Sequence, residues 1–371
     1  MQTKVHQPKW VISILQKDMV QQLRMNWVFF GFIFCIIPGV ITAQIRTVPL
    51  HDTSYYKTFE KYLIVHSFLT SKYTSLGLTG YTNSENIRYM PNTPLSVGLG
   101  VTYNFLTLNL GVGLGFLNNN SEEFNTNYLD LQTHIYIRKV SLDLYGQFYK
   151  GYYLPGTVIP QYTGKNYFRP DLNVNFLGIA GYYIFNSGHF SYRASLVQDE
   201  WQKKSSGSLL LGGEIYYGSI YGDSDLIPGN LQAGYSTQKI HRVHFFEIGP
   251  GAGYAYTFVF QQHFFLTGAI NLNAAFAYNR EFGISTAFRI GINPNFTYRA
   301  IAGYNGNRWA INLSWINNQI SFAGLYSGES YRIKTGMYNL TVNYRFKLER
   351  RVRRKINHIT DKIKQLIPNI R

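Results

Sequence analysis

The segment Tyr338-Asn339-Leu340-Thr341-Val342-Asn343-Tyr344-Arg345-Phe346 decides the fold. Large apolar or aromatic side chains alternate in it with polar ones, without exception. Successive side chains of a β-strand point to opposite faces of a sheet, so the alternation predicts a strand with one apolar and one polar face. The same period of two returns in the stretches 129–138 and 140–148.

The composition excludes the two commonest classes of protein. Only 15% of the 371 residues are charged, whereas 17% are aromatic. A soluble domain carries about 25% charged residues, so this chain has too few charges to cover a surface that faces water. Its mean hydropathy of −0.15 excludes a bundle of apolar membrane helices. Transmembrane β-barrels combine both properties, because lipid-facing apolar residues alternate with polar residues that face the interior.

Strand-like segments separated by turns recur along the whole chain, as is typical of a membrane barrel. We therefore predict an all-β fold, a transmembrane antiparallel β-barrel with an even strand number of 12–14. Thirteen segments fit the pattern: 63–79, 94–105, 106–118, 126–138, 139–150, 170–185, 189–200, 205–220, 243–258, 263–278, 283–303, 307–320 and 333–346. Because the number must be even, either a further strand lies in 221–242 or two of the segments form one strand.

The beginning of the chain resembles an export signal. Arg24 precedes an apolar stretch, 27–41, which ends shortly before Ala43. A basic start, a short apolar stretch and a small residue at the cut predict a signal peptide over residues 1–43, with Met19 or Met25 as alternative starts. The stretch falls short of the ~20 apolar residues of a membrane anchor. Residues 44–62 then form an N-terminal periplasmic segment, and 63–346 the outer-membrane β-barrel.

The last 25 residues, 347–371, differ in composition from the barrel. They contain nine Lys or Arg and two acidic residues. Apolar residues recur at intervals of three and four, which predicts a basic amphipathic C-terminal helix. Its apolar face consists of Leu348, Val352, Ile356, Ile359, Ile363 and Leu366. Such a helix lies on an anionic membrane surface, caps the barrel or docks on a periplasmic protein; the alternative is a solvated tail. The export signal argues against nucleic acid as a partner.

The register of the alternating segments also predicts which side chains face the barrel interior. These lumen-lining residues are Asp130, Gln132, His134, Arg138, Asp143, Asn339, Thr341, Asn343 and Arg345. Their mixed charges argue against a filter of one sign. His134 and Asp143, with Ser141, are the candidates for a catalytic site, although an internal polar network explains the same residues.

We predict no metal site and no cofactor. His241, His244 and Glu247 have a ligand-like spacing. On a strand, however, residues three apart point to opposite faces, and these three therefore do not converge on one ion.

Several short motifs resemble a known family. They are His51-Asp52-Thr53-Ser54-Tyr55-Tyr56-Lys57, Lys72-Tyr73-Thr74, Tyr89-Met90-Pro91-Asn92, Gly98-x-Gly100 and Gln202-Lys203-Lys204-Ser205-x-Gly207-Ser208. Together they resemble an uncharacterised outer-membrane protein family of Bacteroidota, a domain of unknown function, over residues 46 to 346. The resemblance implies an outer-membrane location in a Gram-negative bacterium and supplies no site residues.

These observations favour an outer-membrane barrel of unknown cargo that contacts outer-membrane lipid. Its leading function is that of a passive channel or of a structural or assembly component, and a non-enzyme is favoured. One alternative is a barrel hydrolase that acts on lipid or lipopolysaccharide. Another is an outer-membrane partner of a secretion or gliding apparatus.

Overall fold

The structure is a computed structural model that describes residues 51–59, 61–80, 86–103, 106–115, 124–156, 165–229, 231, 235, 239–326 and 328–349. The predicted signal peptide and the predicted tail helix lie outside the described residues. Of the predicted apolar face of that helix, only Leu348 is described; Val352, Ile356, Ile359, Ile363 and Leu366 are not. Leu348 follows the last strand, and its N–H donates to the carbonyl of Lys61 at 3.4 Å.

Nearly all of the described chain forms antiparallel β-strands, which confirms the predicted fold class at this level. The strands are β1 (Tyr56–Thr58), β2 (Tyr62–Thr79), β3 (Asn86–Tyr89), β4 (Ser96–Tyr103), β5 (Leu106–Gly113), β6 (Asn127–Asp130), β7 (Thr133–Ile137), β8 (Val140–Leu154), β9 (Tyr167–Ile184), β10 (Glu200–Gln202), β11 (Ser206–Tyr221), β12 (Arg242–Phe260), β13 (Phe264–Phe282), β14 (Thr286–Asn305), β15 (Trp309–Ala323) and β16 (Ser330–Lys347). A short helix, α2 (Tyr192–Ser195), interrupts them.

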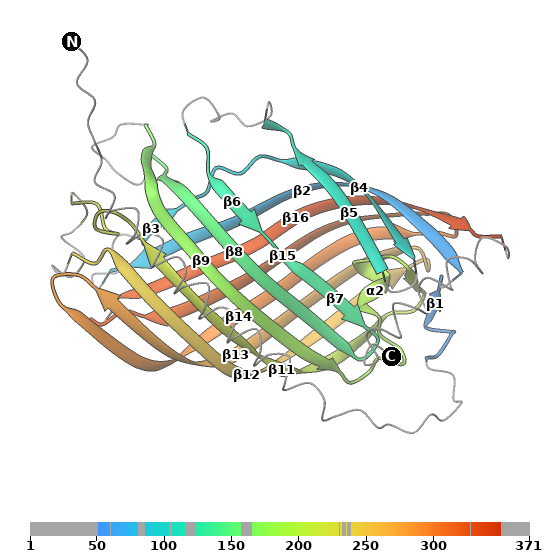
Figure 1. The fold of residues 1–371 in the computed structure, drawn as a ribbon. Coiled ribbons are helices and arrows are strands. Elements are labelled where there is room, and N and C mark those ends of the chain that lie inside the picture. Colours follow the sequence, from blue (N-terminus) through green and yellow to red (C-terminus); the bar gives the residue numbers. More distant parts are fainter. Residues whose placement is uncertain are drawn as a thin grey trace, which may run out of the picture. The chain divides into compact units, whose positions relative to one another are not determined.

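Fourteen of these strands form one curled sheet, shown in Figure 1. Its order is β5-β4-β2-β16-β15-β14-β13-β12-β11-β9-β8-β6. β3 and β4 pair with the same strand, β2, while β6 and β7 both pair with β8. The fourteen strands therefore occupy twelve positions, and both numbers lie within the predicted range of 12–14.

Two expectations about the strand count are corrected. The segment 189–200, predicted as a strand, contains α2 and the beginning of β10, and it does not join the large sheet. No strand lies among the described residues of 222–241, between β11 and β12. Without this false strand, twelve predicted segments remain and match the twelve positions. The segment 126–138 is divided into β6 and β7, and β3 lies outside every predicted segment.

The predicted closed barrel is also corrected. In the described residues, no ladder joins β5 at one edge of the sheet to β6 or β7 at the other. The two flanks meet instead through β3 and β8. Met90 and Tyr153 form an isolated bridge in which each N–H donates to the other's carbonyl, at 2.9 and 3.0 Å. The twelve positions thus leave an open seam beside β5.

The sheet has two ends that differ in their connections. Tight turns at 138–139, 261–263 and 306–308 lie at what we call the short-turn end. The longer links 222–241 and 324–329 lie at the opposite, long-loop end. Consecutive antiparallel strands must reverse at alternate ends, so this assignment follows from the pairing of β11 to β16.

The two faces of the sheet are inverted relative to those of a soluble protein. In β13 the exposed side chains are large and apolar, such as Leu266, Leu272 and Phe276 at 58%, 51% and 53% exposure. The alternate side chains, Asn271 and Asn273, are buried. The polar face thus lies inward and the apolar face outward, the arrangement that the alternation predicted. Among the described residues, no helix combines the length and apolar character needed to cross a bilayer.

The backbone of the hairpin turn between β12 and β13 adopts an unfavourable conformation. Gln261 and Gln262 both adopt positive φ, 48° and 60°, which non-glycine residues rarely do. A turn with two such residues favours Asn-Gly.

We therefore expect the double variant Gln261→Asn/Gln262→Gly to raise the free energy of unfolding by about 0.5–2 kcal/mol, because both replacements tolerate left-handed backbone. Denaturant titration in detergent micelles measures the change. An Ala-Ala replacement at the same positions is the control and should not stabilise. A gain that is equal for both variants would contradict the strained turn.

Candidate functional site

Two chain segments form a plug at the short-turn end of the sheet. We define the plug as residues 51–59 and 185–205. Within it β1 pairs with β10, with Tyr56 opposite Gln202 and Thr58 opposite Glu200. The first and the last of the sequence motifs quoted above, 51–57 and 202–208, therefore contact each other although about 150 residues separate them in the chain.

Hydrogen bonds tie the two parts of the plug together and to a neighbouring turn. The Tyr56 hydroxyl donates to the carbonyl of Ser187 at 2.9 Å. The N–H of Lys203 donates to the carbonyl of Tyr55 at 2.7 Å. Trp201 Nε1 donates to the carbonyl of Gln262, in the β12–β13 turn, at 2.5 Å. The plug is therefore attached to the wall of the sheet.

Gln198 is the centre of this attachment. It is fully buried and has φ of 58°, so its backbone is held in the left-handed region. Its side-chain amide donates to the carbonyls of Tyr304 and Ile311 at 3.1 and 3.2 Å. Its side-chain oxygen accepts from Asn312 and Asn343 at 3.1 and 2.7 Å. One side chain thus contacts three strands, β14, β15 and β16.

Arg345 completes what we call the Gln198 clamp. Its Nε and Nη2 donate to the backbone carbonyl of Gln198 at 3.1 and 2.5 Å. Nη2 also donates to Asn305 Oδ1 at 2.7 Å, and Nη1 donates to the carbonyl of Gly306. The guanidinium is 2% exposed, and among the described residues no ion pair neutralises it. Backbone and amide oxygens stabilise the charge instead, as buried ions require.

The plug also holds two adjacent buried carboxyls, Asp199 and Glu200. Arg193 of α2 forms an ion pair with Asp199 and lies 3.9 Å from Glu200 Oε1. The Ser191 hydroxyl donates to Glu200. Burial raises the pKa of both carboxyls, that of Glu200 to about 7. The proximity of Asp199 contributes to the rise at Glu200.

The catalytic candidates form part of a buried charge centre. His134 Nδ1 and Asp143 Oδ1 lie 2.6 Å apart, opposite each other on β7 and β8. Asp143 also forms an ion pair with Arg299 of β14, and both side chains have 0% exposure. The Ser141 hydroxyl is buried and has no hydrogen-bond partner among the residues that the structure describes. The structure therefore brings His134 and Asp143 together but does not connect Ser141 to them.

The other predicted lumen-lining residues occupy the same inner face. Asp130 accepts from Lys72 at 3.0 Å and from the Tyr149 hydroxyl at 2.7 Å. Gln132, Thr341 and Asn343 are buried, whereas Arg138 is half-buried in the β7–β8 turn. Asn339, also half-buried, donates to Thr341 Oγ1 at 2.8 Å.

Sequence reasoning missed two buried carboxylates in the middle of the sheet. Glu214 accepts from Asn273 and Asn295, both at 2.8 Å. Asn295 also donates to Glu247 at 2.6 Å. The sequence did contain a signal for Glu214, because this residue stands at an inward position of an alternating segment. Glu247 was considered only as a metal ligand. Glu247 is buried on the inner face of β12, whereas the half-buried His244 lies on the other face. The described residues contain no group of three or more potential metal ligands.

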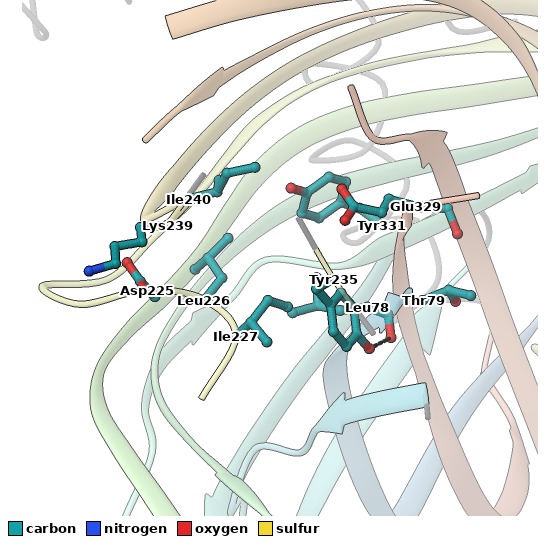
Figure 2. A pocket seen from close by; sticks show the side chains of 11 residues that line it. Leu78, Thr79, Asp225, Leu226, Ile227, Tyr235, Lys239, Ile240, Glu329 and Tyr331 are labelled. Carbon is teal, nitrogen blue, oxygen red and sulfur yellow. Dashed lines mark hydrogen bonds between the residues drawn. The ribbon is translucent and has the colours of Figure 1, made fainter. Parts of the chain in front are cut away.

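A second closure lies at the long-loop end. Leu226, Tyr235 and Ile240 of the 222–241 link are buried against the ends of β2 and β16. Figure 2 shows these side chains around a small cavity, with the Tyr235 hydroxyl donating to the carbonyl of Leu78 at 3.0 Å. The cavity has a volume of about 20 Å³, which is enough for a single water molecule.

With this geometry described, comparison with known proteins gives one family. A family model described as a domain of unknown function, DUF4421, matches residues 51–346. The chain belongs to this family. The match includes every strand from β1 to β15 and most of β16. No curated protein matches the sequence.

Several solved structures are also similar to this chain, at low sequence identity. The outer membrane protease OmpT from Escherichia coli has 8% identity and a TM-score of 0.39, over 78% of this chain and 98% of that one. Ail of Yersinia pestis has 11% identity and a TM-score of 0.19, over 77% and 99%. The toluene transporter TodX of P. putida has 6% identity and a TM-score of 0.22, over 78% and 90%. Likenesses at this level assign no function to the DUF4421 chain.

The buried charge centre should dominate stability. Arg299→Met leaves the Asp143 carboxylate buried without its cation, which should lower the free energy of unfolding by about 3–5 kcal/mol. Denaturant titration in lipid vesicles measures this loss. Arg280→Met, on an exposed position of β13, is the matched control and should change stability little. The double variant Arg299→Met/Asp143→Leu should recover most of the loss. Equal stability of the Arg299 and Arg280 variants would show that the ion pair between Arg299 and Asp143 does not stabilise the fold.

The raised pKa of Glu200 predicts that the plug weakens at higher pH. The pKa rises from 4.5 to about 7 on folding, so between these values the folded state binds more protons than the unfolded state. The stability of the plug therefore falls as the pH rises from about 4.5 to 7. Amide hydrogen exchange of residues 185–205, corrected for intrinsic rates, should show protection decreasing over this range. Glu200→Gln should flatten the profile; an unchanged profile in that variant would assign the effect elsewhere.

Proposed function

We propose that the chain is an outer-membrane β-barrel protein with an occluded interior, which acts as a membrane-embedded structural or assembly component and not as an open channel. Two features support the proposal. The outward face of the sheet is apolar, and side chains and link residues occupy the interior in the middle and near both ends.

The outward face supports the membrane location. Leu266, Ile270, Leu272 and Phe276 are all more than half exposed along one strand. In water each such side chain would forgo about 1.5–3 kcal/mol of transfer free energy, whereas in a bilayer it faces hydrocarbon. A sheet of tilted strands, apolar outside and polar inside, is the architecture of outer-membrane proteins. The predicted signal peptide supports export to that membrane.

Contacts across the interior support the occlusion, and they carry the proposal. Asp143 of β8 contacts Arg299 of β14, although four strands lie between them in the sheet. Tyr216 of β11 accepts from Asn318 of β15 at 2.8 Å. Side chains that reach one another across the sheet narrow the interior. The plug at one end, and Leu226, Tyr235 and Ile240 of the 222–241 link at the other, support the same occlusion.

The hydrolase alternative has less support. A serine nucleophile needs a base within hydrogen-bond reach. The Ser141 hydroxyl makes no hydrogen bond, and Asp143 is already paired with Arg299. The polar residues around His134 are better explained as a network that satisfies buried charges.

Planar-bilayer conductance tests the proposal. The protein, purified from the outer-membrane fraction, should insert and yet give no steady ion current. The double variant Gln198→Gly/Arg345→Gln removes the Gln198 clamp and should give intermittent current, because the plug loses its attachment to β14, β15 and β16. Arg280→Met should remain silent. Steady current through the unchanged protein would overturn the occlusion, and recovery of the protein as a soluble periplasmic species would overturn the membrane assignment.

A further inference from the structure

The outward face carries a hollow that the proposed function does not require. It has a volume of about 630 Å³ and opens away from the interior. The strand register shows how it forms. Gly213 of β11 lies opposite Gly181 of β9 on one side and opposite Pro250 of β12 on the other. Three adjacent strands thus place small or compact residues side by side, next to a row of large apolar side chains.

One wall of the hollow is a continuous row of large apolar residues. Ile215 lies opposite Ile179 on β9 and opposite Ile248 on β12. Ile248 in turn lies opposite Phe276 of β13. These four residues line the hollow. With Leu142 of β8 at its far side, the hollow extends over five strands, roughly 20 Å at ~4.8 Å per strand.

Backbone approach keeps the floor of the hollow small. A Cβ on Gly213 would lie 2.6 Å from the carbonyl oxygen of Gly249, closer than side-chain atoms are found. Pro250 has no N–H, and the β12–β13 pairing stops at Ile248 and resumes at Gly251. The floor is therefore defined by close packing of backbone and by an interrupted ladder.

The chemistry of the lining selects the occupant. All lining side chains are apolar except that of Glu214, which is 3% exposed. Both oxygens of its carboxylate accept inward hydrogen bonds, from Asn273 and Asn295. The lining side chains therefore offer a ligand neither free charge nor hydrogen bonds, only apolar contact. It is continuous with an outward face whose exposed residues, Ile215, Ile248 and Phe276, would contact hydrocarbon in a bilayer.

We propose that this hollow is a binding groove for an acyl chain of a membrane lipid. The inference rests on the proposed membrane location of the outward face. An acyl chain matches the elongated apolar groove, and the lipid headgroup remains outside it. The occupant would be an ordered lipid held at a fixed place on the wall, where neighbouring lipids exchange freely.

Photo-crosslinking of the full chain tests the groove. The protein is reconstituted into vesicles of phosphatidylethanolamine and phosphatidylglycerol that contain a phospholipid with a mid-chain diazirine, and adducts are mapped by mass spectrometry. Ile179, Ile215 and Ile248 should carry several-fold more adducts than Ile292. Ile292 is the matched reference, because it continues the same row of residues across the sheet, opposite Phe276, and is more exposed, at 65%.

Filling the groove should abolish the difference. Gly181→Leu projects into the hollow, and a Cβ there meets only Leu142 Cδ1, at an ordinary 3.5 Å. This variant should lower the adducts at Ile215 to the level of Ile292. Gly268→Leu, on an outward position of β13 with no atom within 4 Å, is the control and should change nothing at Ile215.

The outcomes separate the groove from the membrane assignment. Equal adducts at Ile215 and Ile292 in the unchanged protein would overturn the groove and leave the membrane location standing. Adducts on the rest of the outward face but none in the hollow would also overturn it, because no acyl chain would then enter the hollow. If no outward residue forms adducts, the membrane location itself fails. The comparison within the unchanged protein needs no variant to fold.

Discussion

The structure depends on one constraint, which is that a sheet with an apolar outside must find partners for its buried charges within itself. Water would otherwise hydrate Asn273, Asn295 and Glu214, but here both Asn side chains donate to Glu214, across one and two intervening strands. Arg299 and Asp143 do the same with opposite charges, at full burial. Polar contacts therefore connect strands that are far apart in the sheet. This requirement explains why the side chains that face inward also hold the distant strands of the sheet together.

The plug follows from the same constraint. A short-turn end without a plug would remove the partners that Gln198 gives to Asn343 and Asn312, and it would leave Arg345 with only Asn305 and the carbonyl of Gly306. Gln198 satisfies all three through its carbonyl and its side chain. Its left-handed backbone, which is unfavourable for a residue with a side chain, is maintained by these contacts. The same segment introduces Asp199 and Glu200, whose burial couples the plug to pH.

The sequence predicted the features that depend on a period of two, namely which side chains share a face of a strand. It did not predict features that depend on contacts between distant parts of the chain. The polar and apolar faces of β16 follow from alternation alone, and the inward side chains from His134 to Asp143 were found by parity. Residues 189–200 alternate as well, yet they form α2 and part of β10, because Gln198 and Arg193 find their partners inside the sheet. Arg299 and Glu214 have no local signal beyond their parity; their partners come from strands far away in the sequence. The seam beside β5 and the row of small residues at Gly213 depend on register between strands, which no single segment encodes.

The Gln198 clamp also has a consequence for the order in which the molecule assembles. Arg345 belongs to β16, and the side chain of Gln198 contacts β14, β15 and β16. The contacts to Asn343 and Arg345 can form only when β16 is present, so the plug gains its full attachment only with the last of the described strands. A chain interrupted before β16 would lack this part of the clamp.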